Sequence, residues 1–253
     1  MKKLLKLLIA IVMLILLVVV MTGCDSDDNS SSKSKKSKSK NKTTSSVVSN
    51  QTDDEDNNTT GSTDSKNSNV SVEYLGITPY GDFAFKVKNS GKKPVYIESV
   101  DVIFKDASGN FVKKVSTDVQ YFTVDEQSEV INYAWGYGEK FSEYPNYEFE
   151  VKYSDSYMKE YYITGNFEVT SNDTGSQIAV AVKNNNDKEI KSMKVLVAFY
   201  KDGKIVGCKT GYTDSSVAKG ATGYINVSYP YDSNYDSVKY DKIETYLLAA
   251  STY

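Results

Sequence analysis

The stretch Phe83-Ala-Phe-Lys-Val-Lys-Asn89 alternates apolar and polar residues and then stops at Ser90-Gly91. The stretch Gln177-Ile-Ala-Val-Ala-Val-Lys-Asn184 repeats this pattern and stops at Asn185. Alternation with a period of two is typical of a β-strand that has one buried and one solvated face. Both stretches end in Val-Lys-Asn, and the two asparagines are 95 residues apart (184 minus 89). The repetition predicts two β-rich domains of similar design.

Other segments recur at nearly the same spacing. Asp-Gly flanked by alternating apolar residues is a strong hairpin signal, and Asp202-Gly203 has this context. The remaining matches pair Val95–Phe104 with Ile190–Phe199, Asp106–Gly109 with Lys201–Lys204, Val130–Tyr133 with Tyr224–Val227, and Tyr147–Tyr153 with Lys242–Leu248.

A repeat of this length suits one β-sandwich per copy, since immunoglobulin-type domains have about 100 residues in about seven short strands. Between Val70 and Tyr253 the sequence shows no long 3.6-residue period with capping signals. We therefore expect an all-β protein with two tandem immunoglobulin-like β-sandwiches. Repeat 1 is expected at residues 70–157 and repeat 2 at residues 158–253.

The N-terminal segment has the three parts of a signal peptide. Lys2, Lys3 and Lys6 form a basic head, Leu7 to Val20 is an unbroken apolar run, and small residues precede Cys24. The apolar run is shorter than a comfortable membrane span of about 20 residues. An uncleaved membrane anchor and ordinary secretion stay open as alternatives, and all three place the chain beyond Cys24 outside the cytoplasm.

Thr22-Gly23-Cys24 resembles the lipobox of bacterial lipoproteins, although Met21 stands where leucine is usual. The resemblance implies that residues 1–23 are a lipoprotein signal peptide and that Cys24 carries the lipid, including palmitate, as the mature N-terminus. Two acyl chains anchor a protein stably, whereas one binds only marginally. The expected location is therefore the extracytoplasmic face of the cell membrane, with the lipid on Cys24 as the anchor.

Residues 24–69 are expected to form a disordered tether. This range loses nearly all apolar content, and it contains a basic block at Lys33–Lys40 and an acidic block at Asp53–Asp56. Such a composition cannot bury enough apolar surface to offset the entropy of ordering the chain. The tether would lift the folded part away from the membrane.

Composition excludes several classes of site. The chain has no His, and all of its 30 basic residues are Lys. This removes His-based catalysis and metal ligation, and the net charge of −3 argues against nucleic acid as a partner. Asp232–Asp236 resembles the start of a calcium loop but lacks its glycine and its final glutamate. We expect no metal and no cofactor, and we expect Cys208 to be a buried apolar residue.

The repeated motifs resemble the FxLYD-type immunoglobulin-like modules of lipoproteins from Gram-positive bacteria. The residues that carry the likeness are Val182–Asn184, Val197–Tyr200, Asp202-Gly203, Lys219-Gly220 and Tyr240. Repeat 1 keeps Val87–Asn89 and Phe104 but has Lys105 in place of the tyrosine. These are turn and core residues, so the resemblance implies architecture and location rather than chemistry.

Tyrosine is in clear excess, with 21 residues. In Tyr133-Ala-Trp135-Gly-Tyr137 the rings alternate with small residues, so a strand would project them from one face. These aromatics are the candidate binding residues, with core packing as the equally simple alternative. We expect a non-enzymatic surface protein that binds an envelope protein or glycan. A wall-binding or carbohydrate-binding module is the alternative, followed by a glycan hydrolase with a carboxylate pair.

Overall fold

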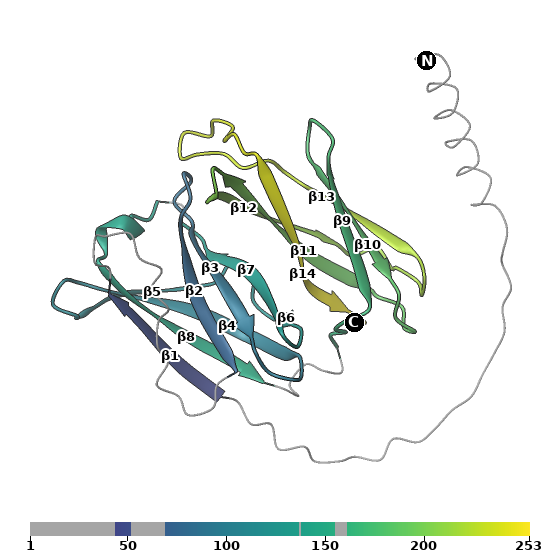
Figure 1. Ribbon diagram of the computed structural model, residues 1–253, viewed down its shortest axis with the longest axis horizontal. Coiled ribbons are helices and arrows are strands. Elements are labelled where there is room, and N and C mark those ends of the chain that lie inside the picture. The colour runs from purple at the N-terminus through teal and green to yellow at the C-terminus, as the bar shows by residue number, and fades with distance from the viewer. Residues whose placement is uncertain (1–43, 52–68, 137, 155–160) are drawn as a thin grey trace, which may run out of the picture. The chain divides into compact units, whose positions relative to one another are not determined.

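The computed structural model describes residues 44–51, 69–136, 138–154 and 161–253 (Figure 1). The expected signal peptide and Cys24 lie outside these ranges. Within them, no helix is both long and apolar enough to cross a membrane. The protein is all-β, as the alternation predicts, and the single helical element of the described residues is η1, a turn of 3-10 helix at Phe141–Glu143.

Repeat 1 contains two antiparallel sheets. One has the strand order β2-β3-β7, and the other has the order β1-β8-β4-β5 with β6 paired to β4. The bounds are β1 Thr44–Gln51, β2 Val70–Ile77, β3 Phe83–Asn89, β4 Val95–Lys105, β5 Phe111–Ser116, β6 Phe122–Val124, β7 Ser128–Ala134 and β8 Asn146–Ser154. Rings from both sheets meet between them: the Phe83 centroid lies 5.2 Å from Phe104, and the Phe85 centroid lies 5.3 Å from Phe149.

Repeat 2 has the same strand order in its two sheets, and its six strands include no counterpart of β1 or β6 among the described residues. Its sheets have the orders β13-β10-β9 and β12-β11-β14. The bounds are β9 Phe167–Asp173, β10 Ile178–Asn184, β11 Ser192–Lys201, β12 Lys204–Thr213, β13 Thr222–Val227 and β14 Lys242–Ser251. The predicted hairpin joins β11 to β12, and both turn residues have positive φ, 50° at Asp202 and 76° at Gly203.

Strand pairing corrects one segment match by one residue. In repeat 1 Val130 lies opposite Val87, whereas in repeat 2 Gly223 lies opposite the equivalent Val182. Val130 therefore corresponds to Gly223 and not to Tyr224. A slip of one residue moves every side chain to the other face of the sheet, so the correction changes which residues face the core.

The last strand of each repeat shows the same slip. Tyr147 pairs with Phe104, and Ile243 pairs with the equivalent Phe199. Tyr147 therefore corresponds to Ile243 rather than to Lys242. The spacing is 96 residues here (243 minus 147) and 95 at the paired phenylalanines (199 minus 104), because the connecting loops differ in length between the repeats.

The asparagine that ends each Val-Lys-Asn motif has a structural role. Its Nδ2 group donates to three backbone carbonyl oxygens: those of Lys93, Val124 and Asp125 from Asn89, at 2.8, 3.1 and 3.1 Å. Asn184 repeats this with the carbonyls of Lys188, Val217 and Ala218 at 2.8, 3.1 and 3.3 Å. Both side chains are fully buried, so they satisfy carbonyl groups that water cannot reach.

Strand β1 lies within the range that the sequence predicts as a disordered tether. Residues Thr44–Gln51 pair antiparallel with β8, from Thr44 opposite Tyr153 to Gln51 opposite Asn146 (Figure 1). Over these eight residues the structure differs from the prediction. The segment lies between the basic and the acidic block and contains the β-branched Val47 and Val48, which favour strands.

The two repeats share one buried contact. The buried cluster that contains the core of repeat 1 also includes residues from the β12-β11-β14 sheet of repeat 2, namely Leu196, Ala198, Ile205, Cys208 and Leu248. Ala84 and Ile131 belong to the same cluster, although pairing places them on the outer face of the β2-β3-β7 sheet. Cys208 is buried, as predicted, and burial raises the pKa of its thiol.

Candidate functional site: an aromatic end of the molecule

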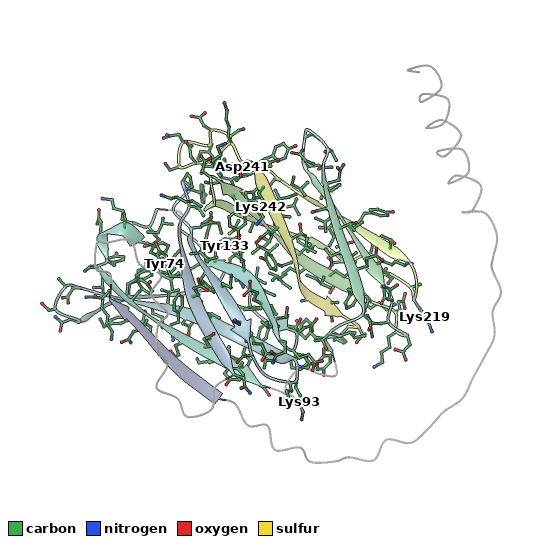
Figure 2. The ribbon with its side chains drawn as sticks, in the orientation of Figure 1. Tyr74, Lys93, Tyr133, Lys219, Asp241 and Lys242 are labelled. Carbon is green, nitrogen blue, oxygen red and sulfur yellow. The ribbon has the colours of Figure 1, made fainter. Side chains whose placement is uncertain are left out.

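The structure removes Tyr133 from the set of candidate binding aromatics. Its side chain is 7% exposed, and its hydroxyl donates to Oδ2 of Asp118 at 2.9 Å. Burial is also the main cause of the raised pKa of this phenol, and Thr210 of repeat 2 forms a hydrogen bond with it. Figure 2 shows Tyr133 in the interior of the fold. The ring lies on the outer face of its sheet, as alternation requires, but repeat 2 covers that face.

Trp135 is the exposed member of the predicted set. It follows the end of β7 and is 56% exposed. The next residue, Gly136, lies directly against the turn between β2 and β3, since a Cβ atom there would fall 1.8 Å from the carbonyl oxygen of Gly81. Trp135 is thereby fixed beside this turn. Tyr137 lies outside the described residues.

A second set of rings gathers at the same turn, and we name Tyr80, Tyr231 and Tyr235 the tyrosine cluster. Tyr80 comes from the turn between β2 and β3, and the other two come from the loop between β13 and β14. The Tyr80 and Tyr231 centroids are 5.0 Å apart with edge contact, and Tyr231 stacks on Tyr235 at 5.5 Å. Tyr235 is 61% exposed, so the cluster presents aromatic surface to solvent.

The ammonium group of Lys209 contacts two rings of the tyrosine cluster. Its Nζ lies 3.6 Å from the ring centroid of Tyr231 and 5.1 Å from that of Tyr80. A lysine over an aromatic face contributes about 0.5–2 kcal/mol, depending on how far it is desolvated. Lys209 belongs to β12, so one cation of repeat 2 links rings from both repeats.

Backbone turns fix the positions of these rings. The carboxylate of Asp232 accepts hydrogen bonds from the backbone N–H groups of Asn234 and Asp236 at 2.8 and 3.0 Å. These bonds shape the loop that carries Tyr231 and Tyr235, and the N–H of Ser233 reaches the carbonyl of Pro79 at 3.3 Å. The loop that resembles a calcium site therefore uses its first carboxylate to close a turn.

Asp82 is a buried carboxyl group in the turn that carries Tyr80. It is 3% exposed, and its Oδ1 accepts a hydrogen bond from the N–H of Gly136 at 3.0 Å. Burial raises the pKa of Asp82 to about 6, while the Gly136 N–H and the charge of Lys209 act in the opposite direction. The carboxyl group connects the turn that carries Tyr80 to the segment that carries Trp135.

Sequence reasoning missed the tyrosine cluster and Lys209. The sequence marks Pro79-Tyr80-Gly81 as a turn and Pro230–Ser237 as a loop. Nothing in it shows that residues about 150 positions apart meet, because that contact depends on how the two repeats pack. Tyrosine excess was the available signal, and it led to the segment Tyr133–Tyr137, of which Trp135 is exposed beside the cluster and Tyr133 is buried.

The described residues contain no group of three or more His, Cys, Asp or Glu side chains placed to hold a metal ion. Comparison with models of known protein families and with curated protein sequences finds no match for this chain. The arrangement itself offers exposed aromatic rings, a neighbouring ammonium group and ordered turns. Such groups can bind a ligand by ring stacking and by hydrogen bonds.

Proposed function

We propose that the protein is anchored to the outer face of the cell membrane through lipid on Cys24 and binds an envelope partner without catalysing a reaction. The observation that carries this proposal is the exposed aromatic end: the tyrosine cluster together with Trp135. Tyrosine and tryptophan offer large rigid contact area at low entropic cost, and they are enriched at protein interfaces.

The charges around this end favour binding over catalysis. Asp82 has a raised pKa, but its carboxyl group is buried and already accepts a hydrogen bond from Gly136. Lys209 is held over Tyr231. A substrate at the exposed rings would reach neither group in a form ready for acid–base chemistry.

A carbohydrate ligand is the second candidate. Its support is the stacking of Tyr231 on Tyr235, which leaves an exposed flat ring beside hydrogen-bonding backbone in the Asp232 loop. The immunoglobulin-like modules that the motifs resemble fit either ligand, since loops at the end of a sandwich are a common binding site.

The binding test compares full-length variants for capture of envelope components from solubilised membranes. Tyr235→Ala and Trp135→Ala should each reduce capture at least tenfold, which corresponds to about 1.4 kcal/mol of binding free energy. The control is Tyr224→Ala, because Tyr224 is 73% exposed on β13 and is not part of the cluster. Equal capture by all three variants would refute the site. A soluble wall glycan that competes for capture would identify the second candidate.

The anchoring test uses Cys24→Ala in cells labelled with palmitate. We expect the variant to lose the label and to leave the membrane fraction. Processing and labelling like the wild type would contradict the lipoprotein assignment. Membrane retention without a label would point instead to an uncleaved anchor.

A further inference from the structure

A groove lies where one face of a repeat 2 sheet continues beyond its contact with repeat 1. The β12-β11-β14 sheet packs against repeat 1 through Leu196, Ala198 and Cys208 (Figure 1). Alternate residues of a strand share a face, so Lys194 lies on this same face of β11. The groove beside Lys194 has a volume of about 370 Å³. Pockets of about 300–1,000 Å³ are typical of sites that bind small ligands.

The floor of the groove is a row of residues across the sheet. Lys194 of β11 pairs with Tyr212 of β12 on one side and with Ala249 of β14 on the other. Directly opposed residues point to the same face of a sheet, so these three side chains lie side by side. Because the side chain of Ala249 is small, the row is hollow over β14.

Two tyrosines from outside this sheet border the hollow. Tyr121 comes from the loop between β5 and β6 of repeat 1 and is 44% exposed. Tyr162 lies beside the end of β14, where it pairs with Ser251. Burial raises the pKa of Tyr162, and the phenol of Tyr121 adds to this effect, so the two hydroxyl groups are close together. With Tyr212, which is 72% exposed, phenol rings from both repeats line one groove.

The backbone of Tyr121 is held in a conformation that glycine favours, with φ at 53°. Its neighbour Phe122 is fully buried, and Asn132 Nδ2 donates to the carbonyl oxygen of Val119 at 3.0 Å. These contacts fix the loop on both sides of the exposed ring. Bulky residues in the left-handed region are uncommon, and such strained residues concentrate at binding sites.

The polar side chains of the groove offer both donors and acceptors. Lys194 donates, Asp214 accepts, and the amide of Gln120 does both. One positive and one negative side chain leave the lining without net charge, so a strongly acidic or basic ligand would meet a like charge there. The hydroxyl groups of a neutral sugar donate and accept hydrogen bonds, and the C–H bonds of its ring can pack on the negative face of an aromatic ring.

We propose that this groove binds a neutral oligosaccharide. Pyranose rings stack on Tyr121 and Tyr212, while the hydroxyl groups of the sugar bond to the polar side chains. The groove shares no residue with the tyrosine cluster or with Trp135, so it is a second site and does not rest on the partner-binding end proposed above. Both repeats contribute rings to it, so the site exists only when the repeats are packed together.

The test measures binding of three neutral tetramers to the full-length protein in detergent by isothermal titration calorimetry. The tetramers are of β-linked glucose, α-linked glucose and β-linked N-acetylglucosamine. We expect saturable binding of at least one tetramer, and Tyr212→Ala should weaken it about tenfold or more. Tyr224→Ala is the matched control and should bind like the wild type, because Tyr224 is 73% exposed on β13 and lies outside the groove.

A second variant separates binding from folding. Tyr121→Gly removes the ring and places glycine at a φ that glycine favours. It should weaken binding about tenfold or more without lowering the midpoint of thermal unfolding. A residue with only a structural role would not separate these two measurements.

Four other outcomes each overturn the proposal. All three tetramers fail to bind, or Tyr212→Ala and Tyr121→Gly bind like the wild type. Equal weakening by Tyr224→Ala means that sugars stack on any exposed ring. Loss of binding in Tyr235→Ala, with binding retained in Tyr212→Ala, places the sugar at the tyrosine cluster instead.

Discussion

The two repeats solve the same folding problem with different completeness. Both end their second strand in an asparagine, Asn89 or Asn184, whose side chain donates to three backbone carbonyl groups and which we call the asparagine clamp. Both also use the same strand order in two sheets. Repeat 1 has a further strand from outside its own range, and Val70 and Phe149 behind that strand are fully buried. In the part of repeat 2 that the structure describes, no strand takes this place, and the equivalent positions are half-buried. The difference teaches that closure of a sandwich depends on edge strands as much as on its core pattern.

The largest expected effect is at Phe149, which is fully buried in repeat 1, whereas its counterpart Thr245 in repeat 2 is half-buried. Phe149→Ala in repeat 1 should lower the free energy of unfolding by about 3–5 kcal/mol, because a fully buried ring leaves a cavity. Urea unfolding monitored by circular dichroism measures the change. A loss below about 1 kcal/mol would mean that the two sandwiches are equally open and would break the comparison.

The asparagine clamps test whether the two repeats are stabilised by the same buried hydrogen bonds. Asn89→Ala and Asn184→Ala should each cost about 2–3 kcal/mol, because each leaves buried carbonyl oxygens without a donor. The controls are Lys88→Ala and Lys183→Ala, whose exposed side chains precede each asparagine. If only one clamp proves costly, the repeats do not share this determinant.

Asp82 tests the contact between the repeats through pH. Its pKa of about 6 lies above its value of 3.8 when unperturbed, so its contribution to stability is full below pH 3.8 and is lost as the pH rises through 6. Asp82→Asn should therefore stabilise the fold by about 2 kcal/mol at pH 7 and by almost nothing at pH 4. The difference between variant and wild type across this range is the measurement. A constant difference would show that Asp82 is solvated, which would remove it from the buried contact.

The smallest expected effect is at Thr245, the position in repeat 2 that corresponds to Phe149. Here the substitution should stabilise the protein rather than destabilise it. Thr245→Val should stabilise the protein by about 1 kcal/mol, since it removes a buried hydroxyl group without a partner among the described residues. Thermal unfolding would show a small rise in midpoint. Thr245→Ser is the control, because it keeps the hydroxyl and should give no such rise. Destabilisation by valine would indicate that the hydroxyl is bonded in solution.

The sequence by itself determined the all-β class, the repetition and the hairpin at Asp202-Gly203. These features follow from period-two alternation and from local turn chemistry, which act over a few residues. It also predicted a buried Cys208 in an apolar strand, and the structure confirms this. Trp135 is exposed, as a binding aromatic must be.

Only the tertiary structure decided the register of β7 and β8 against their counterparts, the burial of Tyr133 and the meeting of Tyr80 with Tyr231. Each depends on contacts between segments far apart in the chain, and a local pattern looks the same whether its outer face meets water or another sheet. The pairing of β1 with β8 has the same origin: eight polar and β-branched residues are a strand only when a neighbouring edge accepts their backbone hydrogen bonds.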